Sequence, residues 1–153
     1  MKGTNTVDIL VIEDNPDETS LIAKVIDINQ WNINFNSVKD GIEAMKYLHK
    51  DGKYKSCSTP SLILLDLNLP KKNGLEVLKE IKSNDILKCI PVIVLTNSND
   101  DMDIIRSYEL HANAYISKPF DFDEFESYIY TFKDFWFNSV QLPQNIDYPN
   151  LTD

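Results

Sequence analysis

Residues 62–70 read Leu-Ile-Leu-Leu-Asp-Leu-Asn-Leu-Pro. Four apolar residues in a row, followed at once by an acid and a loop-forming sequence, are typical of a short strand that is buried on both faces. The same arrangement recurs three times: Ile9–Ile12 precedes Glu13 and Asp14, Val92–Leu95 precedes Thr96, and Ala114–Ile116 precedes Ser117 and Lys118. The pattern predicts parallel strands whose carboxyl ends carry polar side chains.

Helical spacing separates these strands, and a fifth strand of more alternating character is expected at Ile33–Val38. Asn15 followed by Pro16 is typical of a helix cap and a first helical residue. Five strands and five helices in strict alternation predict an α/β fold with a doubly wound parallel sheet and right-handed crossovers. We expect one domain over residues 7–138 and a polar C-terminal tail over 139–153.

The composition of the chain argues against several classes of protein. The chain of 153 residues has a net charge of −9 and a pI near 4.6, which argues against nucleic-acid binding because that requires a basic surface. No apolar run approaches the roughly 18 residues of a membrane span, and residues 1–6 are too polar for a signal peptide. Cys57 and Cys89 form no framework or metal spacing, so we expect free thiols and a cytoplasmic protein.

The polar strand ends predict a metal and phosphate site. Ligands of parallel α/β sheets bind beyond the carboxyl ends of the strands, so these side chains should meet in one cleft. The carboxylates of Glu13, Asp14 and Asp66 would repel one another unless a cation intervened. Mg²⁺, a hard ion that is held by few carboxylates together with phosphate, fits best. Lys118 and Thr96 would then contact phosphoryl oxygens.

Each strand end has a plainer interpretation when it is taken alone. Glu13 and Asp14 could simply favour the start of the following helix, and threonine is common in strands. Asp66 is more informative, because it stands at a loop entry and need not cap a helix. Lys118 precedes Pro119, where a cis bond is possible and would aim neighbouring side chains. The combination, on four of five strand ends, favours the shared site.

These motifs resemble the set found in receiver domains of bacterial two-component response regulators. Glu13-Asp14, Asp66, Asn68-Leu69-Pro70, Gly74, Thr96 and Lys118-Pro119 carry the resemblance, which extends from about Asp8 to Phe137. It implies a flavodoxin-like sheet with strand order 2-1-3-4-5. It also implies a signal transducer of the phosphorelay type, with no enzymatic activity on a separate substrate.

The resemblance assigns roles to individual residues. Asp66 would accept a phosphoryl group from a sensor histidine kinase or a phosphotransfer protein. Asp14 and Asp66, with the backbone carbonyl of Asn68, would bind Mg²⁺ (or Mn²⁺) directly, and Glu13 would act through water. Lys118 would pair with the phosphate.

The same resemblance implies a conformational switch. Thr96 would move toward the phosphoryl oxygen, and Tyr115 would turn inward with it. Asn97, which is bulkier than the small residue often found at that position, leaves the access to the site and the rate of dephosphorylation open.

The last predicted helix carries more aromatic residues than one buried face requires. Phe125, Ile129, Phe132 and Trp136 form one helical stripe, and further aromatic residues lie beside it: Tyr128, Tyr130, Phe135 and Phe137. They could widen the core contact, or they could form a homodimer or partner surface with the adjacent strand. The run 135–143 and the long loop before the third strand resemble, more weakly, stand-alone receivers that partner phytochrome kinases. Output would then be protein–protein contact.

Two other classes share parts of this pattern. A haloacid-dehalogenase-like phosphatase also uses an aspartyl nucleophile, but it needs an acid two residues later, where this chain has Asn68. A flavodoxin-type FMN binder needs a hydroxyl- and glycine-rich loop after the first strand, where Glu13 and Asp14 would repel the FMN phosphate.

Overall fold

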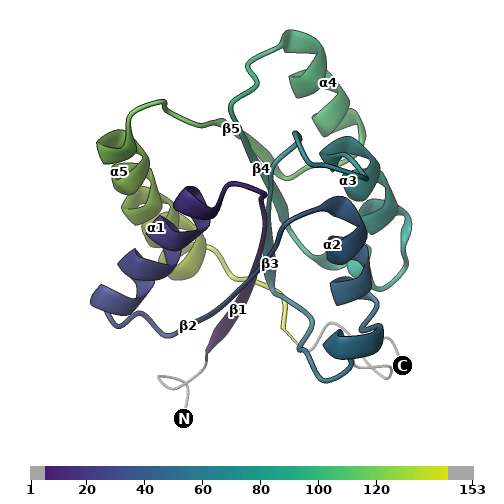
Figure 1. Cartoon of the computed structure of the whole chain (residues 1–153), viewed down its shortest axis with the longest axis horizontal. Helices are drawn as coiled ribbons and strands as arrows, with labels where there is room; N and C mark the ends of the chain where they lie inside the picture. The colour runs from purple at the N-terminus through teal and green to yellow at the C-terminus, as the bar shows by residue number, and fades with distance from the viewer. Residues whose placement is uncertain (1–5, 145–153) are drawn as a thin grey trace.

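The computed structural model describes residues 6–144 and contains one parallel sheet of five strands (Figure 1). The strands are β1 (Val7–Ile12), β2 (Ile33–Val38), β3 (Leu62–Leu65), β4 (Val92–Thr96) and β5 (Ala114–Ser117). Their order in the sheet is β2-β1-β3-β4-β5, which confirms the predicted flavodoxin-like topology.

Helices cover both faces of the sheet. They are α1 (Pro16–Ile28), α2 (Gly41–Leu48), α3 (Gly74–Ser83), α4 (Asp101–Glu109) and α5 (Phe122–Lys133). Figure 1 shows α1 and α5 together on one face and α2, α3 and α4 on the other. Short 3-10 turns, η2 (Gly52–Tyr54) and η3 (Leu87–Cys89), lie before β3 and β4, and a π-helical segment, η4 (Asp134–Ser139), continues α5. Within the described residues, none of the helices combines the length and apolar character needed to cross a membrane.

The strand register aligns the polar strand ends. Ile12 of β1 pairs with Leu65 of β3, so Glu13 and Asp66 leave the sheet side by side. Leu65 pairs with Val94, two residues before Thr96, and Thr96 pairs with Ser117 of β5. Side chains from four strands therefore meet at one edge of the sheet.

The core has one layer on each face of the sheet. Leu10, Ile12, Ile63 and Leu65 point toward α2 and α3, whereas Ile9, Val11 and Leu64 point toward α1 and α5. This alternation follows from the period of two in a strand and explains the near-continuous apolar sequences.

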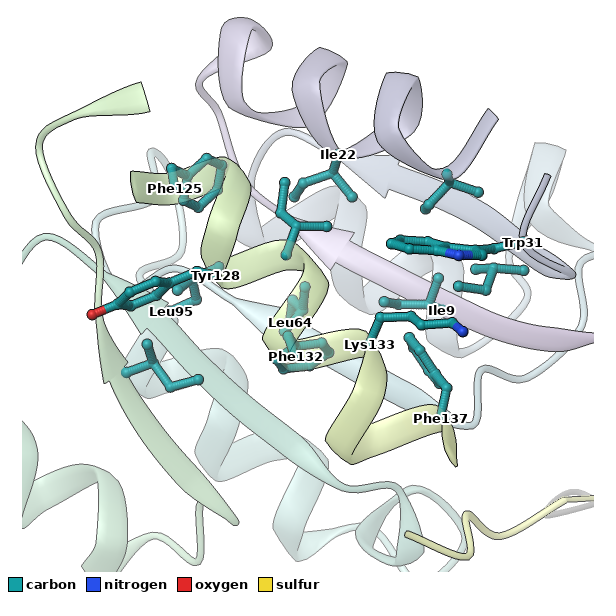
Figure 2. A pocket seen from close by; sticks show the side chains of 14 residues that line it. Ile9, Ile22, Trp31, Leu64, Leu95, Phe125, Tyr128, Phe132, Lys133 and Phe137 are labelled. Carbon is teal, nitrogen blue, oxygen red and sulfur yellow. The ribbon is translucent and has the colours of Figure 1, made fainter. Parts of the chain in front are cut away.

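An apolar cavity of about 50 Å³ lies between the sheet and the helices α1 and α5 (Figure 2). Ile22 of α1, Leu64 of β3 and Phe132 of α5 are among its lining residues. In Figure 2, Lys133 reaches toward Trp31, and its Nζ atom lies 5.1 Å from the centre of the indole ring. This cation–π contact joins the end of α5 to the segment between α1 and β2.

The aromatic stripe of the last helix packs as predicted. Phe125 is buried, and Ile129, Phe132 and Trp136 pack against the same core layer, as does Phe137. The other aromatic residues of this helix and its continuation are exposed: Phe122, Tyr128, Tyr130 and Phe135. The stripe therefore accounts for the core contact and leaves four large side chains at the surface.

Two local features are not what simple sequence patterns would indicate. Helical spacing would favour inward positions for Ile105 and Tyr108 of α4, but both are half exposed and Ser107 is the buried residue. Its hydroxyl donates to the Asp103 carbonyl, so a small polar residue packs closely without an unpaired group. The Lys118–Pro119 bond is trans, as are all other peptide bonds in the described part of the chain. Most of the predicted tail, 145–153, lies outside the described residues.

Candidate metal and phosphoryl site

Asp66 lies at the carboxyl end of β3, and its side chain is held by three hydrogen-bond donors. Its Oδ1 atom accepts from the hydroxyl of Thr96 at 2.8 Å and from the backbone N–H of Asn68 at 3.1 Å. Its Oδ2 atom lies 3.2 Å from Nζ of Lys118. The residue is 7% exposed, so the carboxylate is nearly buried and its orientation is fixed.

The loop after Asp66 is fixed by a glycine. A Cβ atom added to Gly74 would lie only 2.4 Å from the Asp66 carbonyl oxygen and 2.5 Å from Cα of Leu67. The N–H of Gly74 donates to the Leu67 carbonyl at 2.9 Å, which closes the loop on itself. Asn73 and Glu76 then form a reciprocal capping box at the start of α3. The position of Asn68 next to Asp66 follows from this tight loop.

Three acids form the predicted metal centre. Glu13, Asp14 and Asp66 each offer a carboxylate oxygen, and these atoms all lie within 4.8 Å of one another. Glu13 is buried, whereas Asp14 is exposed and leaves the cluster open to solvent. Burial, with a further contribution from the nearby Asp66 carboxylate, raises the pKa of Glu13 to about 8. Hard oxygen donors and excess negative charge match what Mg²⁺ or Mn²⁺ requires.

Lys118 supplies the positive charge of the site from the end of β5. Its Nζ atom lies 2.5 Å from Oε1 of Glu13 and 2.6 Å from Oε1 of Glu18, both closer than Asp66. Burial by itself would lower the pKa of this ammonium group, but the hydrogen bonds to the two glutamates outweigh it and raise the pKa. Lys118 is therefore charged and shared among three acids.

Glu18 was missed by the sequence interpretation. It lies in the first turn of α1, and its side chain is only 12% exposed. The available signal was only its place in the first turn of the helix that begins directly after Glu13 and Asp14, which puts it near the strand end without showing which way its side chain points.

A chain of hydrogen bonds links Thr96 and Tyr115 to α4. The Tyr115 hydroxyl donates to the Ser98 carbonyl at 2.7 Å, and the Ser98 hydroxyl donates to Oδ2 of Asp103 at 2.6 Å. Thr96 is fully buried, while Tyr115 is half buried and packs against the core beneath α3. Tyr115 therefore connects β5, the strand at one side of the sheet, to the loop that follows Thr96.

Comparison with known proteins agrees with this geometry. The sequence model of the protein family described as response regulator receiver domain matches residues 9–130 of this chain. Response regulator Rcp1 of Synechocystis is 42% identical over 88% of this chain and 92% of its own length. The structure of the phosphorylated cyanobacterial phytochrome response regulator RcpA superposes with a TM-score of 0.87 at 42% identity, covering 91% of this chain and 99% of RcpA.

The Mn²⁺-bound form of Rcp1 superposes with a TM-score of 0.85 at 42% identity, covering 90% of this chain and 99% of the other. The phosphatase alternative has no such support, and Asn68 occupies the position where that class needs an acid. Sequence, topology and site geometry thus lead to one assignment. The chain belongs to the response regulator receiver domain family, whose members bind Mg²⁺ or Mn²⁺ and accept a phosphoryl group to transmit a signal.

Proposed function

We propose that Asp66 is the phosphoacceptor and that a histidine kinase or a phosphotransfer protein donates to it. The observation that carries this assignment is the orientation of its carboxylate, held between the Thr96 hydroxyl and the Lys118 ammonium group beside two further acids. A carboxylate oxygen forms a bond to phosphorus while the bond from phosphorus to the donor histidine nitrogen breaks, and that nitrogen takes up a proton. Lys118 offsets the negative charge that would otherwise repel the incoming anion.

Asp14 and Asp66 would hold the divalent ion with the backbone carbonyl of Asn68, and Glu13 would act through water. The exposed Asp14 leaves room for water and phosphoryl oxygens, which Mg²⁺ retains in most protein sites. When bound, the ion supplies positive charge that offsets the acids and the transferred group.

Thr96 and Tyr115 would carry the signal away from Asp66. A phosphoryl group brings nearly two negative charges and new acceptor oxygens to the Thr96 hydroxyl. Movement of Thr96 would alter the loop that contains Ser98, and Ser98 contacts both Tyr115 and Asp103 of α4. The surface formed by α4 and β5 would change in consequence, without the chain acting as an enzyme on a separate substrate.

The partner class follows from the relatives. Rcp1 and RcpA are response regulators, and RcpA is described as a phytochrome response regulator. We infer that this chain acts in the cytoplasm with a kinase of the phytochrome type. Its two free cysteines, Cys57 and Cys89, are compatible with a reducing compartment.

The phosphoacceptor role is tested with acetyl phosphate and Mg²⁺. The unmodified protein should form a hydroxylamine-sensitive acyl phosphate, and Asp66→Asn should abolish it. Asp85→Asn is the matched control, because the Asp85 side chain is 98% exposed and the substitution is chemically the same. Persistent hydroxylamine-sensitive phosphate in Asp66→Asn would remove Asp66 from this role.

We further propose that the exposed aromatic side chains of α5 and η4, with β5, form a homodimer surface. Tyr128 and Phe135 are 43% and 55% exposed, although the stripe beside them already covers the core. Phe135→Ser should shift the protein toward monomer in sedimentation or light-scattering measurements. Ile28→Ser, which removes an even more exposed apolar residue (66%) from α1, should not. A monomeric unmodified protein, with and without a phosphoryl mimic, would contradict the dimer.

A further inference from the structure

Glu18 is a carboxylate at the site that the metal and phosphoryl roles do not use. Its Oε1 atom lies 2.6 Å from Nζ of Lys118, and its Oε2 atom accepts from the side-chain amide of Asn15 at 3.3 Å. Asn15 caps α1, so the contact ties the lysine to the start of this helix. The Glu18 side chain is 12% exposed and that of Lys118 is 3% exposed, so solvent weakens this ion pair little.

The three acceptors around Lys118 are unequally spaced. An ammonium group has three N–H donors, and here they face Glu13 at 2.5 Å, Glu18 at 2.6 Å and Asp66 at 3.2 Å. The two glutamates therefore hold the ammonium group on their side of the cleft. A phosphoryl group on Asp66 would add oxygen acceptors on that side of the cleft, and charge-assisted hydrogen bonds to such oxygens are about 2.7 to 2.9 Å long. To favour such a bond, Lys118 would have to shift its hydrogen bonding away from the two glutamates.

Glu18 opposes this shift more persistently than Glu13 does. Glu13 belongs to the acid cluster, so a bound divalent cation would compete with Lys118 for its carboxylate oxygens. Glu18 lies outside that cluster of three acids, so a cation bound there would leave its contact with Lys118 in place.

We propose that Glu18 is a positioning residue that competes with the phosphoryl group on Asp66 for the Lys118 ammonium group, and thereby limits the stability of the phosphorylated state. The inference rests on the proposed role of Asp66. In the unphosphorylated protein, Glu18 keeps Lys118 oriented and its charge satisfied. In the phosphorylated protein, Glu18 weakens the contact between Lys118 and the phosphoryl group.

Beryllofluoride, a mimic of the phosphoryl group, tests the proposal by titration in the presence of Mg²⁺. Fluorine NMR reports the bound fraction on the full chain. Glu18→Gln should bind the mimic about tenfold more tightly, which corresponds to about 1.4 kcal/mol and to one charge-assisted contact. Phosphorylation by acetyl phosphate should also be faster in Glu18→Gln than in the unmodified protein.

Asp17→Asn is the matched control. Asp17 also lies in the first turn of α1, but it is exposed, and the substitution removes the same charge. Its affinity for the mimic should change less than about twofold, since exposed charges are screened. Equal effects of Glu18→Gln and Asp17→Asn would overturn the proposal, because general electrostatics would then explain both.

A double-mutant cycle with Lys118→Met separates positioning from a merely structural role. If Glu18 acts through the lysine, Glu18→Gln should change mimic affinity less than about twofold when Lys118 is already replaced. A tenfold effect that persists in that background would overturn the inference. So would a loss of Mg²⁺ affinity in Glu18→Gln beyond that of Asp17→Asn, with mimic affinity unchanged.

The outcomes also separate this inference from the proposed function. If the unmodified protein neither binds beryllofluoride nor forms an acyl phosphate, the role of Asp66 fails, and the competition fails with it. If the unmodified protein does both and Glu18→Gln behaves like Asp17→Asn, only the role of Glu18 fails.

Discussion

The Thr96 hydroxyl donates a 2.8 Å hydrogen bond to Oδ1 of Asp66, and it does so from the neighbouring strand with neither side chain more than 7% exposed. Thr96 therefore restrains the carboxylate and is also the first group that a change at Asp66 would move. The Ser98 N–H donates to the Thr96 hydroxyl, and the Tyr115 hydroxyl donates to the Ser98 carbonyl. A change at Asp66 that moves Thr96 should therefore also move Ser98 and Tyr115.

Thr96→Ala should weaken this coupling. Asp66 would keep the Asn68 amide on Oδ1 but lose the hydroxyl, at a cost in the free energy of unfolding of about 1 to 3 kcal/mol. The beryllofluoride-induced NMR shift of the Tyr115 amide should shrink, whereas Thr96→Ser should retain it. A full shift in Thr96→Ala would show that Tyr115 responds by another route.

Divalent metal should stabilise the fold through the three acids. A Mg²⁺ concentration one hundred times its dissociation constant adds about 2.7 kcal/mol to the free energy of unfolding, or about 5 to 10 °C in Tm for a domain of this size. Asp14→Asn should remove most of this increment, and Asp17→Asn should retain it. An unchanged increment in Asp14→Asn would exclude Asp14 as a ligand.

The loop after β3 should tolerate no side chain at Gly74. In Gly74→Ala the added carbon would meet the backbone of Asp66 and Leu67, so we expect about 1 to 3 kcal/mol of lost stability and weaker Mg²⁺ binding. Gly52→Ala is the control: its left-handed conformation costs about 1 to 2 kcal/mol, but it has open space and lies away from the site. Calorimetric Mg²⁺ titration distinguishes the two, and equal affinities would contradict a role for Gly74 in shaping the metal site.

The sequence predicted the parts of the site that follow from strand ends. Asp66 and Lys118 were identifiable because parallel strands in register bring their last residues together. The contact of Glu18 with Lys118 was not, since it depends on how α1 is rotated against the loop after β5. The same holds for α4, where Ser107 is the buried residue although helical spacing would favour its apolar neighbours. Helix rotation is set by tertiary packing, which short periodic patterns determine weakly.

The apolar cavity beneath α1 and α5 should accept added volume. Ile129 lines it, so Ile129→Phe can extend into existing space and should change the free energy of unfolding by less than about 1.5 kcal/mol. Ile81→Phe makes the same substitution in the opposite core layer, at a fully buried residue that does not line this cavity. Overpacking there should cost about 1 to 3 kcal/mol. Urea denaturation measures both variants, and equal losses would mean that the space beside Ile129 is already filled in solution.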